Sequence, residues 1–377
     1  MSLRIAHVTA SPNFGGVERL ILEVCRSLQH AKDVKNIIAT FPEAGNAEPF
    51  LREVEKANFP VYCFKNDMPH LAAATFELHR LLKQHQIQIL CAHGHKSRML
   101  GWFAARYLRI PIIGISHGWT GECRKVQFYE RIDKWMHRRM DHIVCVSQGQ
   151  ADKVIRFGTP ASRVSVIYNA VRMDRFNTPS DISFRHRLES MFPNKPKLIV
   201  GTAGRLSPEK GFDILITAAK KMLTEPQSLD CVGVVIFGDG ILQEALQKQI
   251  DELGISQSVV LAGFTDQLDQ YMHHFDLFVQ SSHTEGMPSV LLEAMSARTA
   301  VVATQVGGTG ELVVEGSTGL MVPPNDLEAL AEAMKKVLND DELRRTMGEK
   351  GRQRVEQSFD IDAQAETYWE LFNRLVQ

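Results

Sequence analysis

The sequence predicts an α/β protein with two doubly wound, Rossmann-like domains. Short apolar runs of strand length alternate with longer amphipathic segments, which is the pattern of parallel sheets joined by crossover helices. The length of 377 residues exceeds what one hydrophobic core normally supports. A polar, proline-rich segment from Asn177 to Pro196 separates two groups of runs. We therefore expect domains over residues 1–175 and 176–358, followed by a C-terminal helix over 359–377.

Thirteen short apolar runs are expected to form the strands of two parallel sheets. The first domain is expected to hold about seven, over Leu3–Thr9, Asn36–Phe41, Pro60–Phe64, Ile87–Ala92, Ile110–Ile115, His142–Val146 and Val164–Ile167. The second is expected to hold about six, over Lys197–Thr202, Val232–Phe237, Val259–Leu261, Leu277–Gln280, Ala300–Thr304 and Leu320–Val322. From Asp326 onward the apolar residues recur three and four apart, which predicts helices to the end of the chain.

The composition is that of an ordinary soluble protein, with 44% hydrophobic and 23% charged residues. No apolar run approaches the roughly 20 residues that a membrane-spanning helix needs. The N-terminus lacks the pattern of a secretory signal, so a cytoplasmic location is expected. The six cysteines include no C-x-x-C pair, which argues against a disulfide framework or a zinc knuckle.

The net charge of −1 hides a strong asymmetry along the chain. Residues 1–175 carry 25 Lys and Arg against 15 Asp and Glu, whereas residues 176–377 carry 18 against 29. Ten of the fourteen histidines also lie in the first part. A basic first domain favours an anionic surface or an anionic substrate as its partner.

Two glycine-containing loops follow predicted strands, where open α/β sheets bind their ligands. Gly15 and Gly16 follow the first strand and open a helix whose free N–H groups can face a phosphate. The loop Gly204–Gly211 presents Arg205 and Lys210, a planar fork and a point charge that together suit a pyrophosphate. Taken alone, either loop is explained somewhat better as a surface turn with solvated charges.

Two other glycine patterns fail the motifs that they approach. Gly238-Asp239-Gly240 lacks the third glycine of the dinucleotide-binding fingerprint, because Gln243 stands at that position. Lys210 is followed by a glycine where the P-loop of NTPases requires Ser or Thr. The sequence therefore excludes a P-loop NTPase and gives only weak support to a dinucleotide site.

The segment Glu285–Met295 places one carboxylate on each side of a helix start. Glu285 lies in the loop before a helix that begins near Pro288, and Glu293 falls in its second turn. Both carboxylates can then face one pocket and accept hydrogen bonds from pairs of sugar hydroxyls. A capped helix packed on the core explains the apolar residues of this segment but leaves the two carboxylates unexplained.

Together these motifs resemble glycosyltransferase family 4, the retaining transferases with the GT-B fold. The resemblance covers nearly the whole chain in order and spacing, and it implies two Rossmann-like domains. The acceptor would bind mainly to residues 1–175 and a nucleotide-sugar to residues 176–358, and the helix over 359–377 would cross back to the first domain. The motifs are Gly15-Gly16-Val17-Glu18-Arg19, His117-Gly118, Gly204-Arg205-Leu206-Ser207-Pro208-Glu209-Lys210-Gly211, Gly238-Asp239-Gly240, Glu285-x7-Glu293 and Gly307-Gly308.

The resemblance implies a donor-binding role for several residues. Arg205 and Lys210 would hold the donor pyrophosphate, with Gly16 approaching it from the other domain. Glu293 would bind the ribose hydroxyls, and Phe264 would border the base.

Other residues would act on the transferred sugar. Glu285 would hold this sugar and its phosphate together with the backbone of the residues that follow it, which are Gly286, Met287, Pro288 and Ser289. His117 would lie beside the reacting sugar, and its position at a strand end favours this role over that of a core histidine. His117 and Glu285 are therefore the two expected catalytic residues.

The implied reaction is transfer of a sugar from a nucleotide diphosphate, with UDP as the expected nucleotide, and with retention at the anomeric carbon. Fixed cations stabilise the charge that develops on the leaving diphosphate. No cofactor or metal is expected, because the only Asp-x-Asp triplet, Asp360-Ile361-Asp362, lies far in sequence from the phosphate motifs. Two alternatives stay open, a GT-B nucleotide-sugar epimerase and a catalytically silent nucleotide-sugar-binding protein.

The segment Arg124–Arg139 predicts contact with an anionic membrane surface. Cations and aromatic residues interleave on one helical stripe, whereas an adjoining stripe is suited to the core. A buried core edge with arginines over it explains the same pattern equally well. Under the functional interpretation, the acceptor is a lipopolysaccharide or another lipid-linked glycan, and the protein is peripheral at the inner membrane face. No nucleic-acid partner is expected. The first stripe is Arg124, Phe128, Arg131, Trp135 and Arg138, and the second is Ile132, Met136 and Met140.

Overall fold

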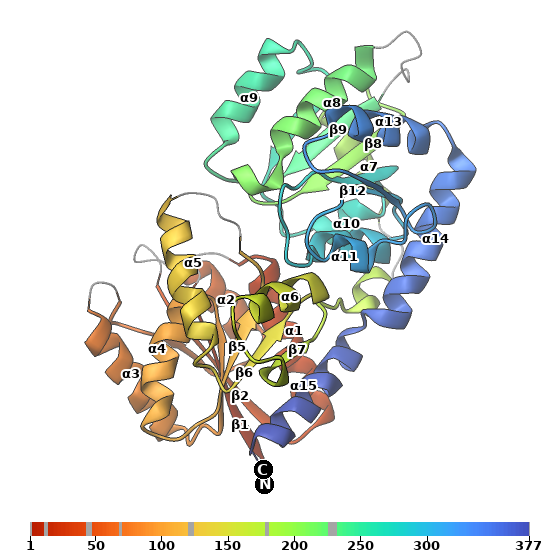
Figure 1. The fold of residues 1–377 in the computed structure, drawn as a ribbon. Coiled ribbons are helices and arrows are strands. Elements are labelled where there is room, and N and C mark those ends of the chain that lie inside the picture. The colour runs from red at the N-terminus through yellow and green to blue at the C-terminus, as the bar shows by residue number, and fades with distance from the viewer. Residues whose placement is uncertain are drawn as a thin grey trace. The chain divides into compact units, whose positions relative to one another are not determined.

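The computed structural model describes residues 2–10, 14–42, 47–67, 70–119, 124–177, 181–224 and 232–376, with only the backbone of residues 124–128. The chain forms two compact units. Unit 1 comprises residues 1–170 and 361–377, and unit 2 comprises residues 171–360. Each unit contains a parallel sheet flanked by helices (Figure 1). The predicted α/β class with two doubly wound sheets is therefore confirmed.

The described part of unit 1 holds a seven-stranded parallel sheet in the order β3-β2-β1-β4-β5-β6-β7. Helices cover both faces, which is why its strands read as nearly continuous apolar runs. The strands are β1 (Leu3–Ala10), β2 (Val34–Phe41), β3 (Val61–Cys63), β4 (Ile89–His93), β5 (Ile112–Ser116), β6 (His142–Cys145) and β7 (Val164–Val166). The helices are α1 (Gly16–Ala31), α2 (Glu48–Lys56), α3 (Leu71–Gln84), α4 (His95–Arg106), α5 (Arg124–His137), α6 (Gln148–Arg156), η1 (Ala161–Arg163) and α15 (Ile361–Val376).

The described part of unit 2 holds a six-stranded parallel sheet in the order β10-β9-β8-β11-β12-β13. Its strands are β8 (Leu198–Ala203), β9 (Val232–Phe237), β10 (Val259–Gly263), β11 (Leu277–Gln280), β12 (Val301–Thr304) and β13 (Leu320–Val322). Its helices are η2 (Met173–Phe176), α7 (Ile182–Ser190), η3 (Pro208–Lys210), α8 (Phe212–Thr224), α9 (Gln243–Glu252), α10 (Leu268–Met272), α11 (Ser289–Ser296), α12 (Thr309–Leu312), α13 (Leu327–Leu338) and α14 (Asp341–Ser358). A strand is present at each of the thirteen predicted positions.

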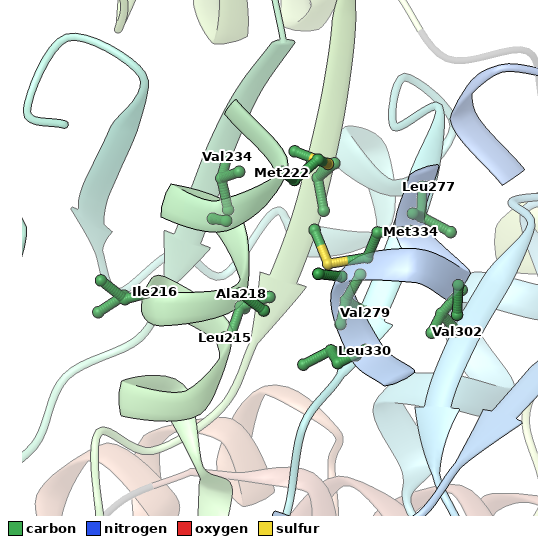
Figure 2. Close-up of a cluster of buried hydrophobic side chains, with 14 of the residues drawn as sticks. Leu215, Ile216, Ala218, Met222, Val234, Leu277, Val279, Val302, Leu330 and Met334 are labelled. Atoms are coloured by element: carbon green, nitrogen blue, oxygen red, sulfur yellow. The ribbon is translucent and has the colours of Figure 1, made fainter. Parts of the chain in front are cut away.

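The main core of unit 2 lies between its sheet and the helices α8 and α13 (Figure 2). Leu330 and Met334 of α13 are fully buried, as the three-and-four spacing of apolar residues predicts. Each such side chain contributes roughly 1.5–3 kcal/mol when it leaves water. The same cluster includes Leu215, Ile216, Ala218 and Met222 of α8 and Val234, Leu277, Val279 and Val302 of the strands.

The last helix, α15, belongs to unit 1 although it follows unit 2 in the sequence. Its apolar stripe is buried in one cluster with β1, β4 and β6. Ser27 on α1 donates to Asp362 across 2.5 Å and adds a polar contact to this packing. The chain passes from unit 1 to unit 2 between Ala170 and Val171, ahead of the proline-rich segment that suggested the boundary. The buried stripe is Ile361, Ala365, Tyr368 and Phe372.

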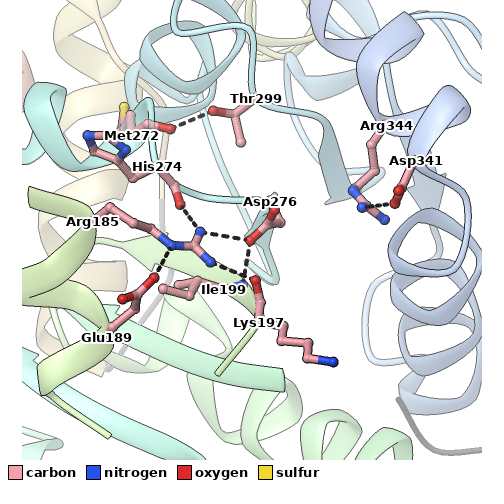
Figure 3. A network of polar contacts seen from close by, with 10 residues as sticks. All are labelled: Arg185, Glu189, Lys197, Ile199, Met272, His274, Asp276, Thr299, Asp341 and Arg344. Atoms are coloured by element: carbon pink, nitrogen blue, oxygen red, sulfur yellow. Dashed lines mark hydrogen bonds and ion pairs between the residues drawn. The ribbon is translucent and has the colours of Figure 1, made fainter. Parts of the chain in front are cut away.

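A polar network joins α7 to the amino ends of β8 and β11 in unit 2 (Figure 3). Arg185 donates to Asp276 across 3.0 Å, to Glu189 across 2.8 Å and to the Lys197 carbonyl across 2.6 Å. Asp276 also accepts the backbone N–H of Ile199 at 2.7 Å. These contacts fix the end of the sheet that lies opposite the glycine- and charge-rich loops.

No helix among the described residues is long and apolar enough to cross a membrane.

Candidate donor-binding site and histidine cluster

The strand order of unit 2 reverses between β8 and β11, so the loops that leave their carboxyl ends lie next to each other. Ligands of open α/β sheets bind at such a switch point. Lys210, from the loop after β8, places its Nζ 2.7 Å from Oε1 of Glu285, from the loop after β11. Ser282 donates to the same carboxylate oxygen across 2.7 Å. The fold thus brings together two residues that the sequence analysis expected at one ligand.

Backbone contacts hold these two loops against each other. Gly211 adopts φ +61°, and a Cβ atom there would lie 2.3 Å from the Ser281 carbonyl oxygen, so this position requires glycine. Ser281 donates through its hydroxyl to the Lys210 carbonyl across 3.0 Å, and the N–H of His283 donates to the Glu209 carbonyl across 2.8 Å. Lys210 is therefore presented from a backbone that is fixed on both sides.

Glu209 is a buried member of the loop after β8 that the sequence analysis did not single out. Burial alone would raise its pKa, but hydrogen bonds from the Ser207 hydroxyl and the Arg205 guanidinium outweigh this effect and lower the pKa. The Arg205 contact measures 3.0 Å, while the Arg205 side chain remains 66% exposed. Glu209 therefore holds Arg205 at one end and leaves much of this side chain open to solvent.

Glu293 lies on α11 and has a cationic partner different from that of Glu285. Arg175 Nη1 lies 3.8 Å from Oε1 of Glu293, and Arg175 Nη2 lies 3.0 Å from Oδ2 of Asp269. These three side chains are mostly buried. The sequence analysis missed Arg175 and Asp269, because no local pattern connects positions so far apart in the chain.

The segment between the two carboxylates forms the start of α11. Pro288 is the N-cap residue, and its carbonyl accepts the N–H groups of Leu291 and Leu292. Gly286, Met287 and Pro288 are buried, and Ser289 is half-buried. Close packing continues behind this segment, because a Cβ atom on Gly307, at φ +52°, would lie 1.9 Å from the Glu285 carbonyl oxygen. Phe264 follows the last residue of β10 and is 64% exposed.

In unit 1 the strand order reverses between β1 and β4, and a row of histidines lies beside this point. His93 ends β4, and its ring nitrogens lie 3.3 Å from His7 and 3.5 Å from His117. The ring planes are 27° and 20° from parallel, and the ring centroids lie 5.6 and 5.8 Å apart. Burial lowers the pKa of His7 to about 4, and burial together with the nearby Arg98 charge lowers the pKa of His117 to about 4. Both imidazoles are therefore neutral at pH 7.

A buried ion pair fixes the backbone that precedes His117. Arg98 on α4 forms two hydrogen bonds with Asp133 on α5, at 2.7 and 2.8 Å, and a third with the Ile115 carbonyl at 2.6 Å. Trp119 donates its indole N–H to the same carboxylate across 2.9 Å. The sequence analysis missed this pair as well, although it anchors the residues on both sides of His117.

Gly16 is exposed and begins α1, with Gly15 as the N-cap residue. The Gly15 N–H donates to the Glu18 carboxylate across 3.0 Å. Gly16 and His117 belong to unit 1, whereas the other expected site residues belong to unit 2.

Two family models together match most of the chain. "Glycosyltransferase Family 4" matches residues 14–175, and "Glycosyl transferases group 1" matches residues 186–354. The chain belongs to glycosyltransferase family 4. The transferase is therefore an enzyme of the class that the sequence motifs indicated.

Its relatives include transferases of cell-envelope glycans. An Escherichia coli protein named UDP-Gal:alpha-D-GlcNAc-diphosphoundecaprenol alpha-1,3-galactosyltransferase is 26% identical over 99% of this chain and 97% of its own length. The lipopolysaccharide core biosynthesis glycosyltransferase LpsE of Rhizobium meliloti is 30% identical over 62% of this chain and 64% of its own.

Solved structures show the same fold. Anabaena HepE in complex with UDP-glucose has a TM-score of 0.86 and 23% identity, covering 99% of this chain and 100% of its own. Sucrose-phosphate synthase from Thermosynechococcus elongatus has a TM-score of 0.82 and 18% identity, covering 99% of each chain. The transferase therefore has the predicted GT-B fold.

Proposed function

We propose that the transferase moves a sugar from a UDP-sugar to a cell-envelope glycan or lipid-linked acceptor, with retention at the anomeric carbon. The observation that carries the proposal is the Lys210–Glu285 pair, because it sets a cation beside a carboxylate where open α/β sheets bind ligands. The titles of the Anabaena HepE structures give UDP and UDP-glucose as ligands. The name of the E. coli relative gives UDP-Gal as donor and GlcNAc-diphosphoundecaprenol as acceptor.

In this proposal Arg205 and Lys210 bind the donor diphosphate. The exposed part of Arg205 is available to phosphate oxygens while Glu209 holds its guanidinium group at one edge. Lys210 exchanges part of its contact with Glu285 for a phosphate oxygen. When the bond between sugar and phosphate breaks, negative charge develops on UDP, and two fixed cations stabilise it.

The remaining donor contacts come from α11 and its neighbours. Glu285 accepts hydrogen bonds from hydroxyls of the transferred sugar, and the backbone of Gly286, Met287, Pro288 and Ser289 lies against that sugar and its phosphate. Glu293 accepts from the ribose hydroxyls. The exposed ring of Phe264 borders the base.

Retention follows when the acceptor hydroxyl attacks from the face that the diphosphate leaves. A phosphate oxygen then takes the proton of the acceptor, and no carboxylate nucleophile is needed. His117 serves as a polar contact beside the sugar, because a pKa near 4 makes it a weak base at neutral pH. Unit 1 supplies the acceptor side.

No divalent metal takes part in the proposed reaction, because Arg205 and Lys210 supply the positive charge. The only Asp-x-Asp triplet lies where unit 2 passes into α15. The Asp362 carboxylate accepts the Ser27 hydroxyl in unit 1, and the backbone of Asp360 pairs with Val171 in unit 2.

In this proposal α5 contacts an anionic membrane surface, and the transferase meets its lipid-linked acceptor there. Arg131 is exposed on this helix, and Arg138, just after its end, is exposed and donates to the Phe157 carbonyl. Trp135 is 46% exposed, with the Arg139 guanidinium 4.5 Å from its ring centre. The buried residues Met136 and Met140 form the core stripe, with Ile132 half-buried beside them. The side chains of Arg124 and Phe128, which belong to the same predicted stripe, lie outside the described residues.

A donor screen tests the function directly. UDP-, GDP- and ADP-sugars are added to the transferase, and the unfolding temperature is measured, because a ligand that binds only the folded state raises it. We expect UDP-sugars to give the largest rise. The configuration of the product formed with the best donor and a lipid-linked diphosphate acceptor is then determined by NMR. Inversion at the anomeric carbon, or isomerisation of the donor without any acceptor, would contradict the proposal.

Liposomes test the membrane part separately. The transferase should co-sediment with anionic but not with neutral liposomes, and the binding should weaken as salt rises, because each Lys or Arg contributes only ~1 kcal/mol at such a surface. Charge reversal of Arg131 and Arg138 to Glu should abolish the binding. Equal partition to both liposome types would leave a soluble acceptor as the better interpretation.

A further inference from the structure

Four polar side chains form a diagonal row across the sheet of unit 1. They are Asn36 on β2, His7 on β1, His93 at the end of β4, and His117 just after β5. Asn36, His7 and His93 are buried, and His117, at the far end of the row, is partly exposed. The facing nitrogens of successive imidazoles lie 3.3 and 3.5 Å apart, at the long end of the hydrogen-bonding range.

Strand register explains why the row exists. Each member lies one strand over and two residues further along than the member before it. Because side chains alternate between the two faces of a sheet, a step of two residues keeps every member on the same face. The register pairs are Ile5 with Asn36, His7 with Cys91, and His93 with Ile115.

At the buried end of the row, the orientation of the Asn36 amide is fixed by its hydrogen-bond partner. Asn36 Nδ2 lies 3.2 Å from the carbonyl oxygen of Cys25 on α1. A carbonyl oxygen can only accept, so the NH₂ group of Asn36 must face it and Oδ1 must face away. Oδ1 of Asn36 and Nε2 of His7 are both buried, and neither has a hydrogen-bond partner within the described part of the chain. Asn36 is close enough to the His7 ring to act on it as a side-chain hydrogen-bonding neighbour, which raises the pKa of His7 against the larger effect of burial.

The orientation of the Asn36 amide then decides which nitrogen donates and which accepts in each imidazole along the row. A proton on Nε2 of His7 would give the unpartnered Asn36 oxygen a donor, and it leaves Nδ1 of His7 as an acceptor for Nε2–H of His93. Nδ1 of His93 then accepts from Nε2–H of His117. The opposite arrangement would set two acceptors, His7 Nε2 and Asn36 Oδ1, against each other in a buried place, at a cost of the order of 1–3 kcal/mol.

We propose that Asn36, His7 and His93 are positioning residues that hold His117 in its Nε2–H tautomer, so that Nδ1 of His117 accepts a hydrogen bond from a hydroxyl group of the substrate sugar. The inference rests on the proposed function, in which His117 lies beside that sugar. His117 is then an acceptor and not a proton relay, because the row ends at an amide that does not pass a proton on. Each contact in the row joins one nitrogen of one imidazole to one nitrogen of the next. Among the described residues, no group of three or more His, Cys, Asp or Glu side chains could hold a metal ion.

The test measures the tautomers directly. Long-range ¹H–¹⁵N spectra are recorded at pH 7.5 on the full-length protein with ¹⁵N-labelled histidine, and His→Gln variants assign the rings. We expect His7, His93 and His117 each to be neutral, with the proton on Nε2 and with Nδ1 far downfield. A proton on Nδ1 of His117, or averaging between its two tautomers, would overturn the proposal.

Variants separate this role from a purely structural one. Asn36→Leu removes the acceptor at the buried end, so His117 should lose its single tautomer, and kcat should fall by up to about tenfold, the value of one net hydrogen bond, with UDP affinity unchanged. Ser165→Ala is the matched control, because it removes the 2.8 Å partner of His142, which lies outside the row. It should shift His142 alone. If Asn36→Leu fails to fold, His93→Leu interrupts the same row, and an unchanged His117 spectrum in either variant refutes the idea.

The outcomes also separate this inference from the proposed function. If His117 has the expected tautomer but the protein transfers no sugar from a UDP-sugar, the proposed function is contradicted and the role of the row in fixing the tautomer is still supported. If the protein transfers sugar from a UDP-sugar but His117 has the other tautomer, only the inference about the row is contradicted.

Discussion

Glu293 offers a test in which the ligand and the protein are altered at the same contact. If its carboxylate holds the ribose hydroxyls, UDP should bind more tightly than 2′-deoxy-UDP by the worth of one hydrogen bond to a charged group, about 1.5–3 kcal/mol. This difference corresponds to roughly a 10- to 150-fold ratio of dissociation constants. The Glu293 side chain is only 13% exposed, so solvent should weaken this bond little.

The variant Glu293→Gln keeps the shape and removes the charge. Arg175 retains its 3.0 Å contact with Asp269 in this variant, so the fold should survive. A neutral hydrogen bond is worth about 0.5–1.5 kcal/mol, and the preference for UDP over 2′-deoxy-UDP should therefore shrink about tenfold. Isothermal titration calorimetry measures all four affinities, with Glu328→Gln on α13 as the control. The same UDP preference in Glu293→Gln and in the wild type would refute the assignment.

Three further predictions concern turnover, metals and acid stability. Glu285→Ala should reduce turnover more than it reduces the affinity for free UDP, because UDP lacks the sugar that this carboxylate is proposed to contact; an equal loss of both would contradict this role. Activity should persist in excess EDTA, and a loss that magnesium or manganese restores would show that a metal is needed. Burial lowers the pKa of His137 to about 4, so below its ordinary value of 6.5 the unfolded chain takes up a proton that the folded chain does not, and stability falls as the pH drops through this window. In urea unfolding the loss between pH 7 and 4.5 should be about 2 kcal/mol smaller in His137→Gln, and an unchanged loss would argue against a buried neutral His137.

Strand positions could be predicted because a strand covered by helices on both faces is a continuous apolar run. Val232–Phe237, Leu277–Gln280 and Leu320–Val322 have the same bounds in the sequence prediction and in the structure. The passage between the units could not be located in this way. Val171 is paired with Asp360, and these are the first and last residues of unit 2, so no local pattern in the sequence reveals the contact.

The site shows the same limit at the level of side chains. The sequence places Lys210 and Glu285 in loops that follow predicted strands, but it reveals neither that these strands are neighbours in the sheet nor that the two side chains pair at 2.7 Å. The ion pairs of Arg175 with Asp269 and of Arg98 with Asp133 join residues on separate elements. Neither residue of such a pair lies in a motif, so the sequence offers no signal for it.

The central claim is that Lys210 and its neighbours on unit 2 bind the diphosphate of a UDP-sugar, and calorimetric titration of UDP into Lys210→Met tests it most directly. Methionine keeps the length of the side chain and removes the charge. Removal of one partner of a buried charged contact costs about 2–5 kcal/mol, so the dissociation constant should rise roughly 30- to 4,000-fold. Lys221→Met is the matched control, because Lys221 on α8 forms an ion pair with Glu328 on α13 and should leave UDP binding unchanged. An unchanged affinity in a folded Lys210→Met protein would contradict the account.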